Sequence, residues 1–385
     1  MNRLFNPHKI EPIPAGVYHL QSAAEDQPPY RVHLRLQPNG SGVLIVNAAT
    51  VIHLNATAAE LAYHFIKGTE PDAVAAQVAS RYRVSRSTAR KDFQQFAGRI
   101  KTLLTTTDVD PVAYMDFERV TPHSVYLTAP LRIDCALTYR LPTGSQAQSA
   151  PTKRVDRELS TAELIQILDK MWQVGVPHVT FTGGEPTLRE DLVALIEHAE
   201  AVGQVCGMLT DGIKLGQRPF LQQILRSGLD HILLTLQPAR AESWRALETV
   251  LAEDVFVTVH ITVNREHAPR AVSHIERIAS LGAKSISLSF SDPGISATSL
   301  TDAASSLGLE LKYDLPVPYS ADNPVARETA ADSIPDGAGR AWLYVEPDGD
   351  VIPAQGMAAA VLGNILRDPW DAIYHPEHSD PGAAR

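Results

Sequence analysis

The chain has 385 residues, of which 44% are hydrophobic and 20% are charged, as is typical of a soluble globular protein with two or three domains. The formal net charge of −10 disfavours bulk binding to nucleic acid. No apolar run reaches the roughly 20 residues that a membrane span needs, and the N-terminus lacks the apolar stretch of a signal peptide, so we expect a cytoplasmic protein with no membrane partner.

Residues 1–105 have the pattern of a small α+β domain. The stretches 30–38 and 42–54 alternate apolar and polar residues, as half-buried strands do, and the turn sequence Asn-Gly-Ser-Gly separates them. Residues 106–127, which follow this domain, are expected to form a linker.

Three helices are expected after these strands. The first is predicted to begin at Thr57, because Glu60 follows three residues later in the spacing of a capping box. The second covers 71–83. The third opens near Ser85 and carries apolar residues at helical spacing.

Residues 128–295 alternate predicted strands and helices, which argues for a parallel sheet with right-handed crossovers. One helix is expected to begin at Ser160, with Glu163 completing a capping box. Periodicity alone allows both a flat doubly wound sheet and a partial barrel. The six predicted strands are 131–139, 178–183, 205–212, 231–237, 255–264 and 285–290.

Residues 296–385 form a last block, which begins with a stretch rich in Pro, Ala, Ser and Asp. The segments 341–347 and 350–354 are predicted to pair as a hairpin, because Asp-Gly-Asp joins them. We interpret this Asp-Gly-Asp sequence as the hairpin turn and not as a calcium loop.

The segment Gly183-Gly184-Glu185-Pro186 directly follows an apolar strand and opens a helix. Glycines at such a turn let the backbone approach a ligand closely, and the helix start offers free N–H groups. Glu185 could accept hydrogen bonds from an ammonium group. A tight strand-to-helix turn, whose acidic residue suits the helix dipole, explains the same residues without a ligand.

This segment and the strands around it resemble the radical S-adenosylmethionine (SAM) superfamily. The resemblance covers residues 128–295 and includes the first-strand end Leu-Thr-Tyr-Arg and the third-strand sequence Met-Leu-Thr-Asp-Gly. It implies a partial (β/α)6 TIM-like barrel. It also implies that Gly183, Gly184, Glu185 and Pro186 contact the amino group of SAM, with Thr210 and Asp211 at the end of the third strand.

The chain departs from this family where the iron–sulfur cluster is bound. Members carry three cysteines in CxxxCxxC spacing after the first strand, and the matching positions hold Leu141, Ser145 and Gln148. Leucine cannot ligate iron, and serine and glutamine are poor substitutes for thiolates. We therefore expect no iron–sulfur cluster, no other metal and no radical chemistry, with SAM binding that is weak or absent.

The C-terminal block resembles the twitch or SPASM extension that follows many such barrels. The resemblance rests on Gly-Ala-Gly-Arg, the following strand and the sequence Val-Leu-Gly-Asn-Ile. Members commonly carry auxiliary-cluster cysteines where this chain has Asp336 and Ala354. The extension is therefore expected to be degenerate.

The N-terminal block resembles the RiPP recognition element, a small winged-helix-like domain, most clearly over residues 51–68. In that family a leader peptide adds as a strand to the sheet edge, which is expected here within 43–54 or 30–36. Two alternatives stay open, DNA binding through the third helix and a role in dimerisation only. That helix and its start carry the basic residues Arg83, Arg86, Arg90, Lys91, Arg99 and Lys101.

Other residues with chemical potential are scattered along the barrel strands. The two cysteines, Cys135 and Cys206, are interpreted as small buried hydrophobic residues and not as catalytic thiols. His178, His231 and His260 lie at strand starts or interiors, where a core or rim position is favoured over a metal site.

These observations predict a radical-SAM-like protein without a cluster and with no catalytic residue of its own. It is expected to bind a precursor peptide and to assist a partner, either an active radical SAM enzyme or a second copy of the chain. Two alternatives remain: an enzyme that uses SAM without a cluster, and a radical SAM peptide maturase whose cluster site is lost in this chain.

Overall fold

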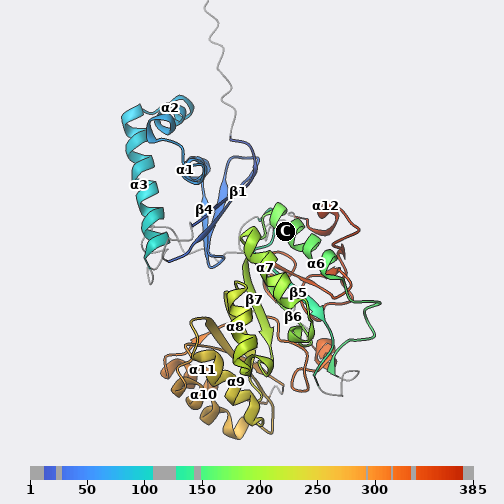
Figure 1. Cartoon of the computed structure of the whole chain (residues 1–385). Helices are drawn as coiled ribbons and strands as arrows, with labels where there is room; N and C mark the ends of the chain where they lie inside the picture. Colours follow the sequence, from blue (N-terminus) through green and yellow to red (C-terminus); the bar gives the residue numbers. More distant parts are fainter. Residues whose placement is uncertain are drawn as a thin grey trace, which may run out of the picture. The chain divides into compact units, whose positions relative to one another are not determined.

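The computed structural model describes residues 13–22, 28–106, 127–142, 149–291, 294–313, 315–330 and 335–375. The chain divides into two compact units, Met1–Thr128 and Ala129–Arg385 (Figure 1). Most of the predicted linker 106–127 lies outside the described residues.

The first unit contains an antiparallel four-stranded sheet in the order β1-β2-β3-β4. The first strand was not predicted, because its residues are nearly all half-buried and show no alternation. Since this strand pairs with the second, residues 30–36 are internal to the sheet, and the prediction of a free edge there was wrong. Within the described part of the chain, the outer strands of this sheet are the first and the fourth. The strands are β1 (Gly16–Gln21), β2 (Arg31–Leu36), β3 (Gly42–Val46) and β4 (Thr50–Leu54).

Three helices follow, and two of them cover one face of this sheet, where α1 and α3 pack on alternate apolar strand residues. The cap predicted at Thr57 was wrong, because the Asn55 side chain accepts a hydrogen bond from the Ala58 N–H at 2.9 Å and begins the helix. The cap predicted at Ser85 is confirmed, since its hydroxyl accepts from the Thr88 N–H. The helices are α1 (Ala56–Ile66), α2 (Pro71–Tyr82) and α3 (Arg86–Thr105).

The second unit is built on a sheet in the order β11-β10-β9-β8-β7-β6-β5-β12-β13-β14. All six predicted barrel strands are present and run parallel, so the architecture is a partial (β/α)6 barrel whose sheet stays open. The six strands are β5 (Arg132–Thr138), β6 (His178–Gly183), β7 (Val205–Thr210), β8 (His231–Thr235), β9 (Phe256–Val263) and β10 (Ser285–Phe290).

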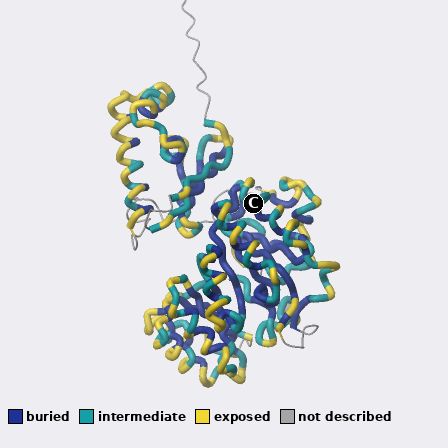
Figure 2. The backbone as a smooth tube through the Cα atoms, viewed as in Figure 1, coloured by how far each residue is buried: buried dark blue, intermediate teal, exposed yellow. Residues whose placement is uncertain are grey.

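Helices alternate with these strands and bury their apolar faces against one side of the sheet (Figure 2). The predicted capping box of the first helix is confirmed, with Ser160 and Glu163 exchanging both hydrogen bonds. Within the described residues, no helix is long and apolar enough to cross a membrane. The helices are α6 (Thr161–Val174), α7 (Leu192–Val202), α8 (Arg218–Arg226), α9 (Ala241–Leu251), α10 (Ala271–Ser280) and α11 (Ala297–Ser306).

The predicted C-terminal hairpin is confirmed and continues the barrel sheet. Its first strand runs parallel to β5 and antiparallel to the next strand. The short elements of this region are β11 (Glu310–Leu311), β12 (Trp342–Val345), β13 (Asp350–Ile352), β14 (Gly363–Asn364) and α12 (Trp370–Ile373), and the 3-10 turns of the unit are η1 (Pro186–Leu188), η2 (Lys214–Gly216), η3 (Ala268–Arg270) and η4 (Val325–Ala330).

Candidate functional site

The predicted glycine pair lies where the end of β6 passes the end of β5. Gly183 has φ +129°, and a Cβ atom there would lie 2.1 Å from the Thr138 carbonyl oxygen. A Cβ atom on Gly184 would lie 2.3 Å from the Arg140 carbonyl oxygen. The Gly184 N–H donates to Thr138 O at 2.7 Å, and the Glu185 N–H donates to Arg140 O at 2.9 Å. The chain itself therefore requires both glycines, with or without a ligand.

The structure brings Glu185, Thr210 and Asp211 together at the ends of β6 and β7. Glu185 is only 2% exposed and accepts hydrogen bonds from the Thr210 hydroxyl at 2.7 Å and from the Asp211 N–H at 2.8 Å. A third donor, the Thr187 N–H, lies at 3.0 Å. The carboxyl group thus ties the ends of two neighbouring strands together.

Burial, together with the neighbouring Asp211, raises the pKa of Glu185 to about 8. Burial also raises the pKa of Asp211. Glu185 therefore holds a proton in much of the population at neutral pH. A protonated carboxyl group that already accepts three hydrogen bonds is a weak partner for an ammonium group.

The cavity beside this carboxyl group is small. It has a volume of about 70 Å³, which suits about two water molecules, whereas cofactor sites usually exceed about 300 Å³. One wall is formed by residues 318–322, and the Tyr319 N–H donates to the Gly183 carbonyl oxygen at 3.0 Å. The chain segment after β11 thus covers the turn that the family resemblance assigns to SAM.

Leu141, at the first of the three cluster positions, packs in the core. Leu141 is 8% exposed and lies in an apolar cluster with Tyr139, Tyr319 and Tyr344. The other two positions, Ser145 and Gln148, lie outside the described residues.

Neither cysteine is placed to bind a cluster. Cys135 and Cys206 are buried in β5 and β7, with their side chains in the core between sheet and helices. Burial raises the pKa of Cys135 to about 12, whereas a metal ligand must be a thiolate. The donor set of this chain therefore does not fit an iron–sulfur cluster.

A buried ionic network that the sequence did not predict centres on Arg154. Its guanidinium contacts Glu328 at 2.7 Å and Glu346 at 2.6 Å. The Tyr139 hydroxyl donates to Glu346 at 2.9 Å, and the Tyr319 hydroxyl donates to Glu328. The network fixes the loop before α6 to η4 and to the end of β12, next to the apolar cluster of Leu141.

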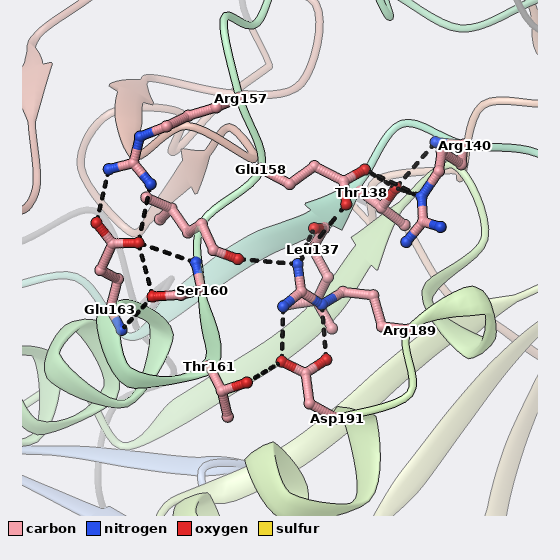
Figure 3. A network of polar contacts seen from close by, with 11 residues as sticks. Leu137, Thr138, Arg140, Arg157, Glu158, Ser160, Thr161, Glu163, Arg189 and Asp191 are labelled. Carbon is pink, nitrogen blue, oxygen red and sulfur yellow. Dashed lines mark hydrogen bonds and ion pairs between the residues drawn. The ribbon is translucent and has the colours of Figure 1, made fainter.

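A second network, drawn in Figure 3, braces the end of β5. The Arg189 guanidinium donates to both carboxylate oxygens of Asp191, at 2.8 and 2.6 Å, and to the carbonyl oxygens of Leu137 and Leu159. Glu158 accepts hydrogen bonds from Thr138 and Arg140. Neither Arg154 nor Arg189 was predicted from the sequence, because their partners are distant in the chain or lie in loops without periodicity.

The three histidines do not converge. His178 and His231 pair across β7, with their Nε2 atoms 3.3 Å apart, over the position where Gly207 has no side chain. His260 lies apart from them and contacts hydroxyl groups of Ser287 and Ser289. Among the described residues, no group of three or more His, Cys, Asp or Glu side chains is placed to hold a metal ion.

Comparison with known proteins gives the barrel a family. Residues 135–288 match the Radical SAM superfamily. The second unit contains a radical SAM superfamily domain.

Relatives of this chain include proteins named PqqA peptide cyclase. The one from Streptomyces rochei is 28% identical over 282 residues, which cover 65% of this chain and 77% of that enzyme. The one from Methylocella silvestris is 29% identical over 180 residues, which cover 43% of this chain but only 48% of that enzyme. The chain thus spans about half to three quarters of the cyclases that it matches.

The similarity to solved structures extends beyond the radical SAM domain. SuiB from Streptococcus suis, solved with its precursor peptide SuiA, matches with a TM-score of 0.58 at 12% identity, over 92% of this chain and 89% of SuiB. SuiB solved with S-adenosylmethionine matches with a TM-score of 0.57, at 13% identity, over 89% of this chain and 87% of SuiB. At such low identity the likeness establishes the fold alone.

Proposed function

We propose that this protein is a radical-SAM-like peptide-binding protein that carries no iron–sulfur cluster and supports a partner in peptide modification. The observation that carries the proposal is the donor set, because both cysteines are buried in core strands and Leu141 packs in an apolar cluster. The family's radical chemistry depends on the cluster. The chain therefore contributes binding and positioning.

Peptide binding is supported by the relatives and by the shape of the first unit. The relatives include enzymes named for the cyclisation of a peptide, and a fold neighbour was solved with a precursor peptide. Among the described residues, β1 and β4 are the edges of the four-stranded sheet, and each pairs with one strand. Such an edge can accept a peptide as an added strand. We assign this role to residues 1–105, joined by the linker 106–127 to a barrel at 128–295 and a degenerate twitch- or SPASM-like extension at 296–385.

A second candidate function is SAM binding without a cluster. It is favoured by Glu185, Thr210 and Asp211, which lie together at the strand ends where the family resemblance places SAM. We assign cofactor contacts to these residues and to Gly183, Gly184 and Pro186 only if residues 318–322 move away. Binding in the described arrangement should be weak, because the cavity is small and the carboxyl group has its hydrogen bonds.

The proposal is tested by anaerobic reconstitution with iron and sulfide, followed by iron analysis. We expect less than one iron atom per chain and no broad thiolate-to-iron absorption band. About four irons per chain, with such a band, would contradict the proposal. Peptide binding is tested by titrating the full chain with a synthetic precursor peptide, taken from any short open reading frame found beside its gene, and duplex DNA serves as the competing ligand.

A further inference from the structure

A pocket in the first unit lies at one end of the four-stranded sheet. It has a volume of about 230 Å³ and lies between the turn after β2, the start of α1 and the end of α2. Ile13, Leu36 and Ala56 supply apolar walls. Sites for whole small molecules usually exceed about 300 Å³, so this pocket suits a single side chain.

Two groups of opposite charge line this pocket. Glu60 on α1 has 3% of its side chain exposed, and Arg81 on α2 has 20%. Their closest atoms, Arg81 Nη1 and Glu60 Oε2, are 3.4 Å apart. Neither Glu60 Oε1 nor the Nε and Nη1 atoms of Arg81 make a hydrogen bond, although all three are buried. Buried polar groups are nearly always hydrogen-bonded, so these three atoms are available to bind a ligand.

His64, which lies beside this pair, does not hydrogen-bond to Glu60. The His64 Nε2 atom lies 3.7 Å from Glu60 Oε1, beyond hydrogen-bond distance, and its Nδ1 atom contacts Thr69. The Tyr82 hydroxyl donates to the Ala56 carbonyl oxygen at 3.3 Å and also lies close to Glu60, so that burial and the Glu60 carboxylate raise the pKa of Tyr82. The atoms that remain for a ligand are Glu60 Oε1 and the Nε and Nη1 atoms of Arg81.

We infer that this pocket binds the carboxamide of an asparagine or glutamine side chain of a peptide, an inference that rests on the proposed peptide-binding role of the first unit. A carboxamide supplies an N–H₂ group for Glu60 and a carbonyl oxygen for Arg81. The two charges of the pocket balance, so it selects a neutral group. A carboxylate would face Glu60, and an ammonium would face Arg81.

The position of the pocket suits a peptide bound along the sheet edge. Leu36, which lines the pocket, lies opposite Gly16 in the register of β2 and β1. Ile13, three residues before Gly16, lines the pocket as well. A peptide strand added along β1 therefore has its terminal residues near the pocket, and one side chain can enter it.

The test uses the full chain with ¹³C-labelled methyl groups and three probes, the N-acetyl, N-methylamide derivatives of glutamine, glutamate and methionine. We expect the glutamine probe to shift the signals of Ile13 and Ala56 saturably. The glutamate and methionine probes should bind at least about tenfold more weakly, because each leaves a buried polar group without a partner. Equal binding of all three probes, or no shift at Ile13 and Ala56, would overturn the inference.

Two variants separate recognition from folding. Glu60→Gln removes one charge, so the pocket becomes net positive, and we expect its preference to reverse by about tenfold or more in favour of the glutamate probe. Ala56→Leu, at an exposed position, should block all probes while the spectrum keeps its dispersion. An unchanged preference in Glu60→Gln contradicts the inference.

The same variants distinguish this inference from the proposed function. If the precursor peptide binds the wild type and both variants equally, the pocket has no part in recognition although the peptide-binding function stands. If the precursor does not bind the wild type at all, the proposed function fails.

Discussion

The buried Glu185 should make the stability of the second unit depend on pH. Its pKa is about 8 in the folded chain, against an ordinary value of 4.5. Between these values the folded state keeps a proton that the unfolded state has released. The free energy of unfolding therefore falls as pH rises through this window, by at most about 1.36 kcal/mol per pH unit. The whole window corresponds to about 5 kcal/mol.

Glu185→Gln removes this titration, because the amide resembles the protonated acid and cannot ionise. Relative to the wild type, the variant should gain stability from pH 5 to pH 8, by up to about 4 kcal/mol. Denaturant unfolding followed by tryptophan fluorescence measures this directly, since all four tryptophans, Trp172, Trp244, Trp342 and Trp370, lie in the second unit.

Glu163→Gln is the matched control, because Glu163 makes stability depend on pH in the opposite direction. Its hydrogen bonds with Arg157 and Ser160 lower the pKa of the exposed Glu163 to about 2. The stability that it contributes is present above pH 4.5 and is lost as pH falls toward 2. The two variants should therefore diverge from the wild type in separate pH ranges. A constant difference between Glu185→Gln and the wild type from pH 5 to pH 8 would refute the reasoning.

Three further predictions follow from the site. Calorimetry should give a dissociation constant for SAM on the order of 0.1 mM or weaker, since loss of the bonds to iron removes several kcal/mol; low-micromolar binding that Glu185→Gln abolishes would favour SAM-dependent chemistry. Arg154→Met should cost about 3 kcal/mol by leaving Glu346 buried without its cation, whereas Arg157→Met, at an exposed ion pair, should have little effect in the same denaturation assay. Gly184→Ala should cost about 3 kcal/mol or more through its clash with Arg140, while Gly98→Ala in α3, where nothing lies within 4 Å, should raise the melting temperature.

Regular elements were predictable because their signals are local. Each barrel strand is a short apolar run between turn residues, and Ser160 and Glu163 carry their capping box within four positions. The edge strand β1 was missed, because its half-buried residues carry neither alternation nor a continuous apolar run. The misplaced helix start has a similar cause, since Asn55 and Thr57 are both good caps and only the backbone geometry decides between them.

The candidate site was predictable only in part. The Gly183–Pro186 turn and the Thr210-Asp211 pair are visible because a family resemblance marks them. The Arg154 network joins residues up to 207 positions apart, and no local pattern links a loop arginine to Glu328 and Glu346. The cover formed by residues 318–322 likewise depends on how an irregular segment returns to the barrel.

Retention of the Gly-Gly-Glu-Pro turn in this chain does not require retained cofactor chemistry. Both glycines are needed for the approach to Thr138 and Arg140, and Glu185 links the ends of β6 and β7 through two hydrogen bonds. A chain that lost the cluster would still lose stability if this turn changed. At the first of the cluster positions, Leu141 packs in an apolar cluster with Tyr139, Tyr319 and Tyr344. The fold therefore needs this turn whether or not the chain binds a cluster.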